Sequence, residues 1–557
     1  MSASNAGRSH PGVMNSSPAE QPAGDGLRPL VAELLVIRAS GHLEDQQRRY
    51  PRWELSTAEL KQLLSSGVGG VILLGGSATE LQQRTRQLLS WAERPLLLCA
   101  DVEEGVGQRF EGASWLVPPL ALGRLHRQQP DRALELAERY GRCTAEQARR
   151  CGLNWVLGPV CDVNNNPLNP VINVRAWGED PSTAGSLAAA FQRGLSAGGV
   201  LGCAKHFPGH GDTASDSHLD LPVLPHDRER LQRIELPPFR TAIAAGVDSV
   251  MTAHLLLPQL DPDRPATLSP AVLTDLLRRD LGFEGLIVTD ALVMEAIASR
   301  HGAGEAAVLA FEAGADLILM PADAEAAITA LCDGFSSGRL PLPRLHQALQ
   351  RRRAALQRIA SGEQQGTTIS VAADRRLEAE LVQACITTRP AGGISATAGI
   401  NLIRVDGVFP CPALQGMAPA RQLPEQQGFR SVVIHGQGIS PWQNNPEAPL
   451  ALDRIGEGAV LLQLFLRGNP FRGGKDSQEP WRAAVMQLQS RNRLAGLVVY
   501  GSPYLWEELE PHLDPGIPAA FSPGQMPEAQ RQALTALLNR SVPGESELST
   551  ASADFTD

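Results

Sequence analysis

Apolar strand-like runs alternate with amphipathic helical stretches from Leu27 to about residue 360, and this alternation most constrains the fold. The runs are Val31–Ile37, Gly70–Leu74, Pro95–Ala100, Leu153–Val163, Val200–His206, Ser249–His254, Leu286–Asp290 and Asp316–Met320. Helical stretches such as Arg132–Cys151 and Arg228–Ala244 lie between most of them. About eight βα units in this stretch favour an α/β fold of the (β/α)8 TIM-barrel type. A doubly wound sheet is the alternative, but it would rarely need eight parallel strands.

The chain has 557 residues, which is too long for one ordinary domain. We expect the barrel domain to take residues 27–360, a polar linker residues 361–370, and a smaller α/β domain residues 371–540. The second domain is expected to have a mostly parallel sheet, because strand-like and helical stretches alternate there too. Residues 1–26 and 541–557 are predicted to be disordered tails, the second one acidic.

Composition excludes some classes of function. Acidic residues (60) outnumber basic ones (50), which argues against a general nucleic-acid binder. No apolar run reaches the length of a membrane span, and the first residues lack the apolar core of a signal peptide. The eight cysteines are scattered without a CxxC pair, so a reducing compartment is the simpler interpretation.

The stretch Lys205–Pro222, KHFPGHGDTASDSHLDLP, carries the densest set of ionisable groups and follows an apolar strand-like run. Its ionisable residues are Lys205, His206, His210, Asp212, Asp216, His218 and Asp220. Other strand-like runs also end in polar residues: Asp101, Glu103 and Arg109; Asp162, Asn164 and Arg175; His254; and Asp290. Active sites of barrel enzymes lie at the C-terminal ends of the strands, so these ends predict one shared pocket.

Two features of this set indicate acid–base chemistry. Asp216 and His218 are two residues apart, so in an extended loop their side chains fall on the same side. A carboxylate that holds one imidazole nitrogen leaves the other to donate or accept a proton. Asp290 could be a nucleophile, a general base or an ion-pair member. A metal site on His206, His210, Asp212, Asp216 and His218 is the rival, although the spacing matches no zinc motif.

The stretch resembles the signature of family 3 glycoside hydrolases of the β-N-acetylhexosaminidase branch, in which KHFPGHG is followed by Asp-Ser-His. Similar segments recur in order: the Asp101–Phe110 region, GPVCDVNNNP, RAWGED, MTAH and TDALVM. The resemblance covers roughly residues 30–360. More loosely, the second domain resembles the α/β sandwich that follows the barrel in two-domain members.

The resemblance implies roles for these residues. Asp290 is the expected nucleophile, and His218 paired with Asp216 is the expected general acid/base, where most glycosidases use a second carboxylate. The residues expected to hold the terminal N-acetylglucosamine are Asp101, Arg109, Arg175, Lys205 and His206, with His254 and His210 behind them. No cofactor and no metal are implied. The implied substrate is an N-acetylglucosaminyl saccharide or muropeptide, in the cytoplasm, with no nucleic-acid or membrane partner.

One loop departs from the family pattern. The family usually has a Gly-Gly-Arg run after Asp-x-Glu, whereas Glu104 and Val106 stand here in place of the first Gly and the Arg. Because Glu tolerates fewer backbone conformations than Gly, this loop is expected to have a different shape.

The resulting prediction is a retaining exo-β-N-acetylglucosaminidase. The alternatives are a β-glucosidase, a glycoside phosphorylase, a metal hydrolase and a non-catalytic sugar-binding protein. In the branch that the chain resembles, the acid/base lies on the barrel loop, so the resemblance implies that the second domain need not supply catalysis.

Overall fold

The computed structural model describes residues 24–213, 221–359, 372–389, 392–407, 411–467 and 479–538. The expected linker and the acidic tail, residues 361–370 and 541–557, lie outside these segments. Helix α1 (Gly24–Ala32) begins inside the expected N-terminal tail and continues into the first expected strand. Val31 is therefore helical, and the strand starts only at Leu35. A short apolar run does not by itself distinguish a buried helix turn from a strand, which explains this wrong boundary.

Eight parallel strands form a closed barrel, as predicted. They are β1 (Leu35–Ser40), β2 (Gly70–Leu74), β3 (Leu97–Ala100), β4 (Trp155–Val156), β5 (Cys203–Phe207), β6 (Ser249–Thr252), β7 (Leu286–Val288) and β8 (Ile318–Leu319). Continuous ladders give the orders β4-β3-β2-β1-β8 and β5-β6-β7. Parallel bridges from Trp155 to Leu201 and from Val288 to Leu317 join the two sheets on both sides. The ring is therefore complete, which excludes an open doubly wound sheet.

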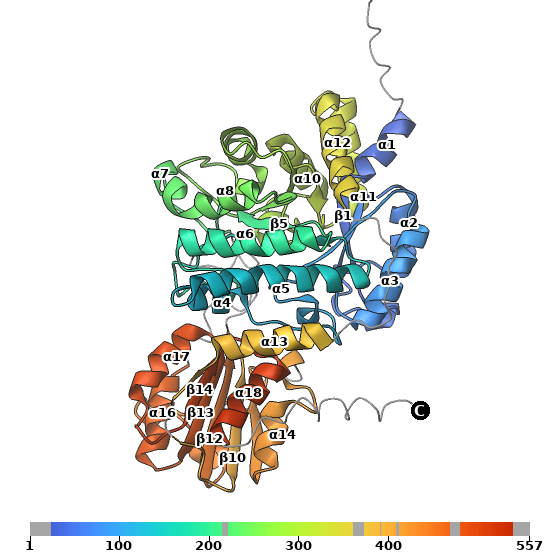
Figure 1. Ribbon diagram of the computed structural model, residues 1–557. Helices are drawn as coiled ribbons and strands as arrows, with labels where there is room; N and C mark the ends of the chain where they lie inside the picture. The colour runs from blue at the N-terminus through green and yellow to red at the C-terminus, as the bar shows by residue number, and fades with distance from the viewer. Residues whose placement is uncertain are drawn as a thin grey trace, which may run out of the picture.

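Helices surround this barrel (Figure 1). They are α2 (Thr57–Ser65), α3 (Ala78–Trp91), α4 (Pro119–His126), α5 (Pro130–Arg150), α6 (Pro181–Ala197), α7 (Arg228–Arg230), α8 (Leu236–Ala244), α9 (Glu295–Ala298), α10 (Ala303–Ala313), α11 (Ala324–Ser336) and α12 (Leu342–Arg358), with π-helical segments η4 (Leu231–Glu235) and η6 (Ala271–Asp280). Local sequence fixes several starts. Ser56 and Ser77 each form a capping box with a Glu three residues later.

The C-terminal domain is a six-stranded sheet with helices on both faces. Its strands are β9 (Thr387–Thr388), β10 (Gly399–Val405), β11 (Phe429–Ile434), β12 (Ala459–Leu466), β13 (Leu494–Gly501) and β14 (Ala519–Ser522), in the order β11-β10-β12-β13-β14-β9. Only β9 is antiparallel. Its helices are α13 (Ala372–Cys385), α14 (Pro419–Glu425), α15 (Leu452–Ile455), α16 (Trp481–Ser490), α17 (Pro503–Leu509) and α18 (Pro527–Leu537).

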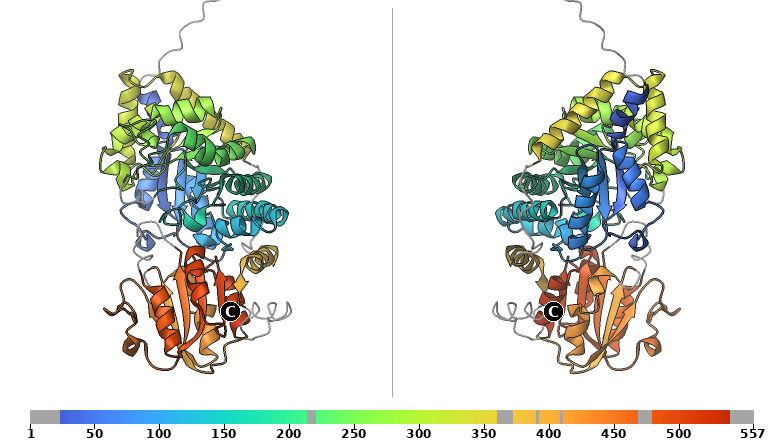
Figure 2. Two further views of the ribbon diagram at one scale, coloured as in Figure 1. Left: turned by 90° about the vertical axis from the view of Figure 1, so that its left-hand side faces the viewer. Right: turned by 90° about the vertical axis from the view of Figure 1, so that its right-hand side faces the viewer.

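Separate apolar clusters fill the two faces of this sheet. Residues of α16 and α17, such as Trp481 and Trp506, pack on one face, and residues of α14 and α18, such as Ala420 and Leu534, pack on the other. The views in Figure 2 show the sheet domain at one end of the barrel domain. This arrangement confirms the predicted α/β sandwich.

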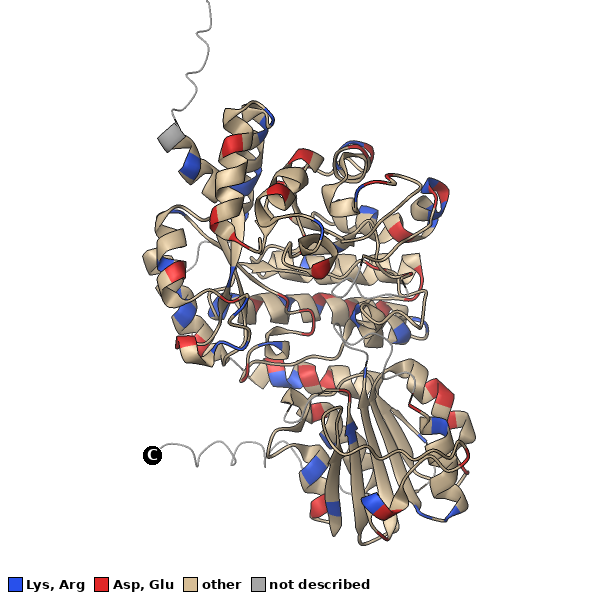
Figure 3. Ribbon diagram, turned by 180° about the vertical axis from the view of Figure 1, so that it is seen from behind, with Lys and Arg blue, Asp and Glu red and all other residues tan. Residues whose placement is uncertain are grey.

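Helix α13 lies between the two domains, against α18 on one side and α4 and α5 on the other (Figure 1). Ion pairs also cross the boundary, including Arg139 Nη2 to Glu380 Oε2 at 2.6 Å and Arg124 with Glu507. Figure 3 shows acidic and basic residues interspersed over the helices of both domains. No helix within the described segments is both long and apolar enough to cross a membrane.

Candidate active site

An ionisable residue stands two positions after a barrel-filling residue within β1 and β5 and just after β3 and β7. The pairs are Val36 and Arg38, Cys99 and Asp101, Cys203 and Lys205, and Val288 and Asp290, and the first member of each pair belongs to the apolar cluster inside the barrel. Side chains two residues apart on a strand point to the same face. Each second member therefore continues the barrel interior at its C-terminal end, where barrel enzymes place their chemistry.

Lys205 is the centre of a buried charge network. Its Nζ lies 2.7 Å from Asp101 Oδ1 and 2.6 Å from Glu103 Oε1, and its side chain is only 1% exposed. Burial alone would lower the pKa of Lys205, but the two carboxylates outweigh burial and raise it. Lys205 is therefore a fixed cation between two carboxylates, and Asp101 stays partly open to solvent.

Arg175 completes the charge balance around Glu103. Its Nε and Nη2 each donate to one Glu103 oxygen at 2.8 Å, which is the strong bidentate geometry. Burial would raise the pKa of Glu103, yet Arg175 and Lys205 together hold it well below its usual range. Arg175 Nη1 also donates to the Val171 carbonyl at 3.0 Å. The guanidinium is therefore fixed from both sides.

Asp162 organises the two histidines of the KHFPGHG stretch. Its Oδ2 lies 2.7 Å from His206 Nδ1, and its Oδ1 accepts from the backbone N–H groups of His206 at 3.1 Å and His210 at 2.7 Å. Although burial opposes it, His206 lowers the pKa of Asp162. Burial lowers the pKa of His210 to about 4, so this imidazole is neutral at pH 7. His206 Nε2 lies 3.5 Å from Arg175, which joins this group to the Lys205 network.

Asp290 follows β7 on the same side of the barrel interior as Val288. Its backbone N–H donates to Thr252 Oγ1 at 3.2 Å, and its Oδ1 accepts from the N–H of Ala291 at 2.7 Å. His254 lies behind this turn, with Nε2 3.0 Å from the Ala291 carbonyl and Nδ1 2.8 Å from Thr267 Oγ1. These contacts fix the backbone turn that carries the Asp290 side chain.

The structure places most of the predicted site residues together. Asp101, Lys205, Arg175 and His206 form one connected network, and the exposed Arg109 donates through Nε to the Asp101 carbonyl at 3.0 Å. Asp216, His218 and Asp220 lie in residues 214–220, outside the described segments.

Of the five candidate metal ligands, the three described ones, His206, His210 and Asp212, have other partners, and Asp216 and His218 lie outside the described segments. Asp212 Oδ2 pairs with His226 Nε2 at 3.0 Å and Arg230 Nη2 at 3.2 Å, and His210 Nδ1 lies 2.8 Å from Thr213 Oγ1. Across the described residues, no group of three or more His, Cys, Asp or Glu side chains is placed to hold a metal ion.

Three site residues were missing from the predicted sugar-binding set. Glu103 and Asp162 stood among the charged strand ends, but only the structure shows that they pair with Lys205, Arg175 and His206. Arg38 was missed altogether. Its signal was present, because it ends the first apolar run as the other charged residues end theirs.

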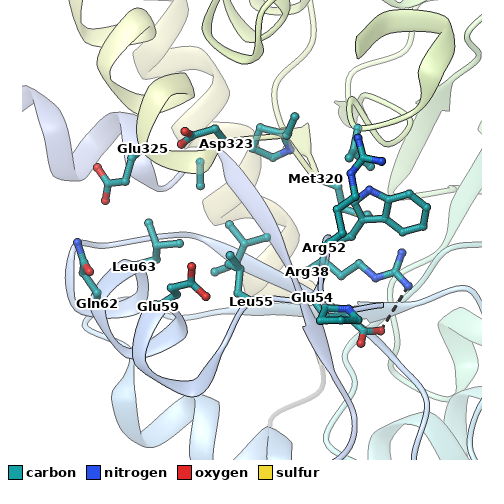
Figure 4. A pocket seen from close by; sticks show the side chains of 17 residues that line it. Arg38, Arg52, Glu54, Leu55, Glu59, Gln62, Leu63, Met320, Asp323 and Glu325 are labelled. Carbon is teal, nitrogen blue, oxygen red and sulfur yellow. Dashed lines mark hydrogen bonds and ion pairs between the residues drawn. The ribbon is translucent and has the colours of Figure 1, made fainter. Parts of the chain in front are cut away.

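Arg38 also lines a cavity of about 330 Å³, together with residues 51–55 and the residues that follow β8 (Figure 4). Its guanidinium lies 3.5 Å from Glu54 and over the rings of Tyr50 and Trp53 at 5.3 and 6.0 Å. The cavity also reaches Val293, three residues after Asp290, and Met320 at the end of β8. Met320 has a φ of 46°, a backbone conformation that costs a non-glycine residue energy and is enriched at functional sites.

Comparisons with known proteins identify the family of both domains. Residues 27–354 match the glycosyl hydrolase family 3 N-terminal domain, and residues 394–539 match the bacterial glycosyl hydrolase family 3 C-terminal domain. A β-hexosaminidase of Stenotrophomonas maltophilia is 38% identical over 271 residues, which are 48% of this chain and 80% of that protein.

Two solved structures show which parts of the chain are shared. A family 3 β-N-acetylglucosaminidase from Paenibacillus sp. superposes with a TM-score of 0.74 at 28% identity, over 93% of this chain and 97% of that one. NagZ from Neisseria gonorrhoeae superposes with a TM-score of 0.52 at 29% identity, over 63% of this chain and 97% of its own. The family matches cover both domains, and the chain therefore belongs to glycosyl hydrolase family 3.

Proposed function

We propose that this enzyme is a retaining exo-β-N-acetylglucosaminidase, which removes terminal non-reducing N-acetylglucosamine through a covalent glycosyl-enzyme. The observation that carries the proposal is the fixed network of Asp101, Lys205, Glu103 and Arg175, which is built from β5 and the loops after β3 and β4, while Asp290 follows β7 of the same barrel. Such a network offers charged donors and acceptors to sugar hydroxyls. The names of the relatives support N-acetylhexosamine as the sugar.

Asp290 is the proposed nucleophile. In the first step its carboxylate oxygen bonds to the anomeric carbon while the glycosidic C–O bond breaks, and His218 gives its proton to the leaving oxygen. In the second step His218 takes a proton from water as the water oxygen displaces Asp290. Asp216 is proposed to orient the His218 imidazole. The hydrogen bond from Ala291 to Asp290 Oδ1 supports the first role, because it fixes the carboxylate direction.

The cavity beside Arg38 is proposed to take the leaving group. Its lining includes Val293, three residues after Asp290, and Met320, which follows β8. Trp53 and Arg38 offer an aromatic face and a guanidinium, which suit a second saccharide unit. Peptidoglycan fragments as the substrate and the cytoplasm as the location belong to this proposal through the family resemblance alone.

The test combines substrate choice with covalent labelling. An aryl N-acetylglucosaminide should be cleaved and an aryl glucoside only poorly. A 2-fluoro sugar inactivator should leave its label on Asp290, as peptide mass spectrometry would show. Asp290→Ala should lose at least roughly 10³-fold in kcat while keeping its thermal unfolding temperature, because the nucleophile supplies several kcal/mol of the barrier lowering.

Asp275→Asn is the matched control, since this carboxylate pairs with Arg279 on the exposed face of η6. It should react and label like the wild type. A label on Asp101 or Glu103, or an active Asp290→Ala enzyme, would move the nucleophile elsewhere. Equal rates on the glucoside would favour a β-glucosidase, and rates that require phosphate would favour a phosphorylase.

A further inference from the structure

The loop from Asp101 to Arg109 contacts the C-terminal domain through the residue that departs from the family pattern. Glu103 turns its carboxylate to Lys205 and Arg175 in the barrel mouth. The next residue, Glu104, turns its carboxylate to Arg467, which directly follows β12 of the C-terminal domain. Neighbouring residues of one loop thus contact the candidate sugar site and the other domain.

The contact between Glu104 and Arg467 is bidentate and buried. Arg467 Nη1 donates to Glu104 Oε2 at 3.0 Å, and Nη2 donates to Oε1. The side chains are 1% and 13% exposed, and Trp115 Nε1 adds a hydrogen bond to Oε2 at 2.9 Å. Burial would lower the pKa of Arg467, but Glu104 outweighs burial and raises it. Breaking such a pair on one side leaves an uncompensated buried charge.

The loop transmits this contact because it is internally tied. Glu104 N–H donates to Gln108 Oε1 at 3.1 Å, and the Glu104 carbonyl accepts from Leu116 N–H at 2.8 Å. Gly107 N–H donates to the Ser114 carbonyl at 2.8 Å, and a Cβ at Gly107 would lie 2.3 Å from the Ala113 carbonyl. Residues 101–109 are therefore held against residues 113–116 as one unit.

The loop after β4 is contacted in the same way. Asn164 Nδ2 donates to the Tyr504 hydroxyl at 2.7 Å, and Tyr504 donates to Glu179 at 2.7 Å. Tyr504 lies on α17 of the C-terminal domain, and Asn164 is two residues after Asp162. Two loops that carry the network thus each have a partner in the C-terminal domain.

We infer that Arg467 is a positioning residue for sugar binding: through Glu104 it holds the loop that presents Asp101 and Glu103. This inference rests on the proposed function. It also accounts for Glu104 itself, whose side chain serves the domain boundary and not the pocket. Val106, the other departure, is buried in the barrel domain's apolar core.

Not every ion pair across the boundary should act in this way. Arg124 and Glu507 also join the two domains, from α4 and α17. Arg124 pairs in addition with Glu179 of the loop after β4 at 3.0 Å, and a change of Glu507 leaves that second pair in place. Glu507→Gln is therefore the matched control, because it removes a charge pair between the same domains.

The experiment compares full-length variants. Arg467→Met should raise KM for an aryl N-acetylglucosaminide by roughly 10-fold or more, with a smaller change in kcat, because it loosens sugar contacts. Arg467→Lys keeps the charge but not the bidentate geometry, so its KM should lie between those of the wild type and Arg467→Met. The double variant Glu104→Gln with Arg467→Met should regain thermal stability while its KM stays high. Glu507→Gln should change KM by less than about 2-fold.

Hydrogen–deuterium exchange gives a readout that needs no substrate. Residues 101–116 should exchange faster in Arg467→Met and in the double variant, but not in Glu507→Gln. A double variant with wild-type KM and wild-type exchange would overturn the inference, as would an equal effect of Glu507→Gln. Absence of activity in the wild type on N-acetylglucosaminides would instead refute the proposed function, and the exchange result would still decide the role of Arg467.

Discussion

At the scale of single residues, the groups that keep a fixed charge are different from the group that must gain and lose a proton. Lys205 and Arg175 pair with Asp101 and Glu103, so the two positive and two negative charges balance, while the proposed acid/base must change protonation. An acid/base matters most when the leaving group is poor, because a nitrophenolate departs without a proton and a sugar alkoxide does not. His218→Ala should therefore lose at least roughly 100-fold more rate on a disaccharide than on a nitrophenyl glycoside, measured as kcat/KM. Added azide should restore turnover of the nitrophenyl substrate and give the β-azide, and Asp216→Asn should show a milder form.

Trp53→Ala separates this effect from leaving-group binding. It should also slow the disaccharide selectively, because Trp53 lines the proposed leaving-group cavity, but azide should not rescue it. Equal losses of His218→Ala on both substrates, without an azide effect, would make His218 a positioning residue and require another acid.

At the scale of elements, the packing of α13 on α18 buries the carboxyl group of Glu378, and burial makes its charged form costly. Burial, with help from Glu528, raises the pKa of Glu378 from 4.5 to about 8. The folded state therefore binds more protons than the unfolded state between these values, and stability falls as pH rises through this window. Glu378→Gln should match the wild type near pH 4.5 and exceed it by roughly 1–3 kcal/mol at pH 8, as urea unfolding would measure. If the stability difference between Glu378→Gln and the wild type were the same at pH 4.5 and at pH 8, Glu378 would be solvated in the folded state.

At the scale of the whole molecule, the catalytic candidates lie in the barrel domain, whereas Arg467, which pairs with Glu104 of the Asp101–Arg109 loop, lies in the C-terminal domain. A chain that ends at residue 359 keeps Asp101, Lys205 and Asp290 but loses Arg467, so Glu104 stays without its guanidinium. We expect this shortened chain, if folded by circular dichroism, to retain activity at roughly 1–10% of kcat/KM. Glu104→Gln in the shortened chain should recover part of its stability, because it removes the uncompensated charge. Full activity of the shortened chain would show that the C-terminal domain is dispensable for the site.

Much of the fold and of the candidate site could be predicted from the sequence. The alternation of apolar runs and helices determines the barrel, because each βα unit must cover its strand with a helix. The charged residues that end these runs indicate the mouth, because parallel strands of a barrel bring their C-terminal ends together. Arg38 directly follows the predicted run Val31–Ile37 and obeys the same rule, although the list of charged strand ends began only with the run Pro95–Ala100.

Only the tertiary structure decided which charges meet. Strand periodicity gives the face on which a side chain lies, but its partner depends on how distant strands and loops are placed. Lys205 could have paired with any nearby carboxylate, and the structure gives it Asp101 and Glu103. The sequence showed that Glu104 differs from the family pattern, but it did not show which residue Glu104 pairs with. Its partner Arg467 lies 363 residues away in another domain. A sequence lists the charges of a chain, but burial selects the few that must be neutralised in pairs, and packing alone determines those pairs.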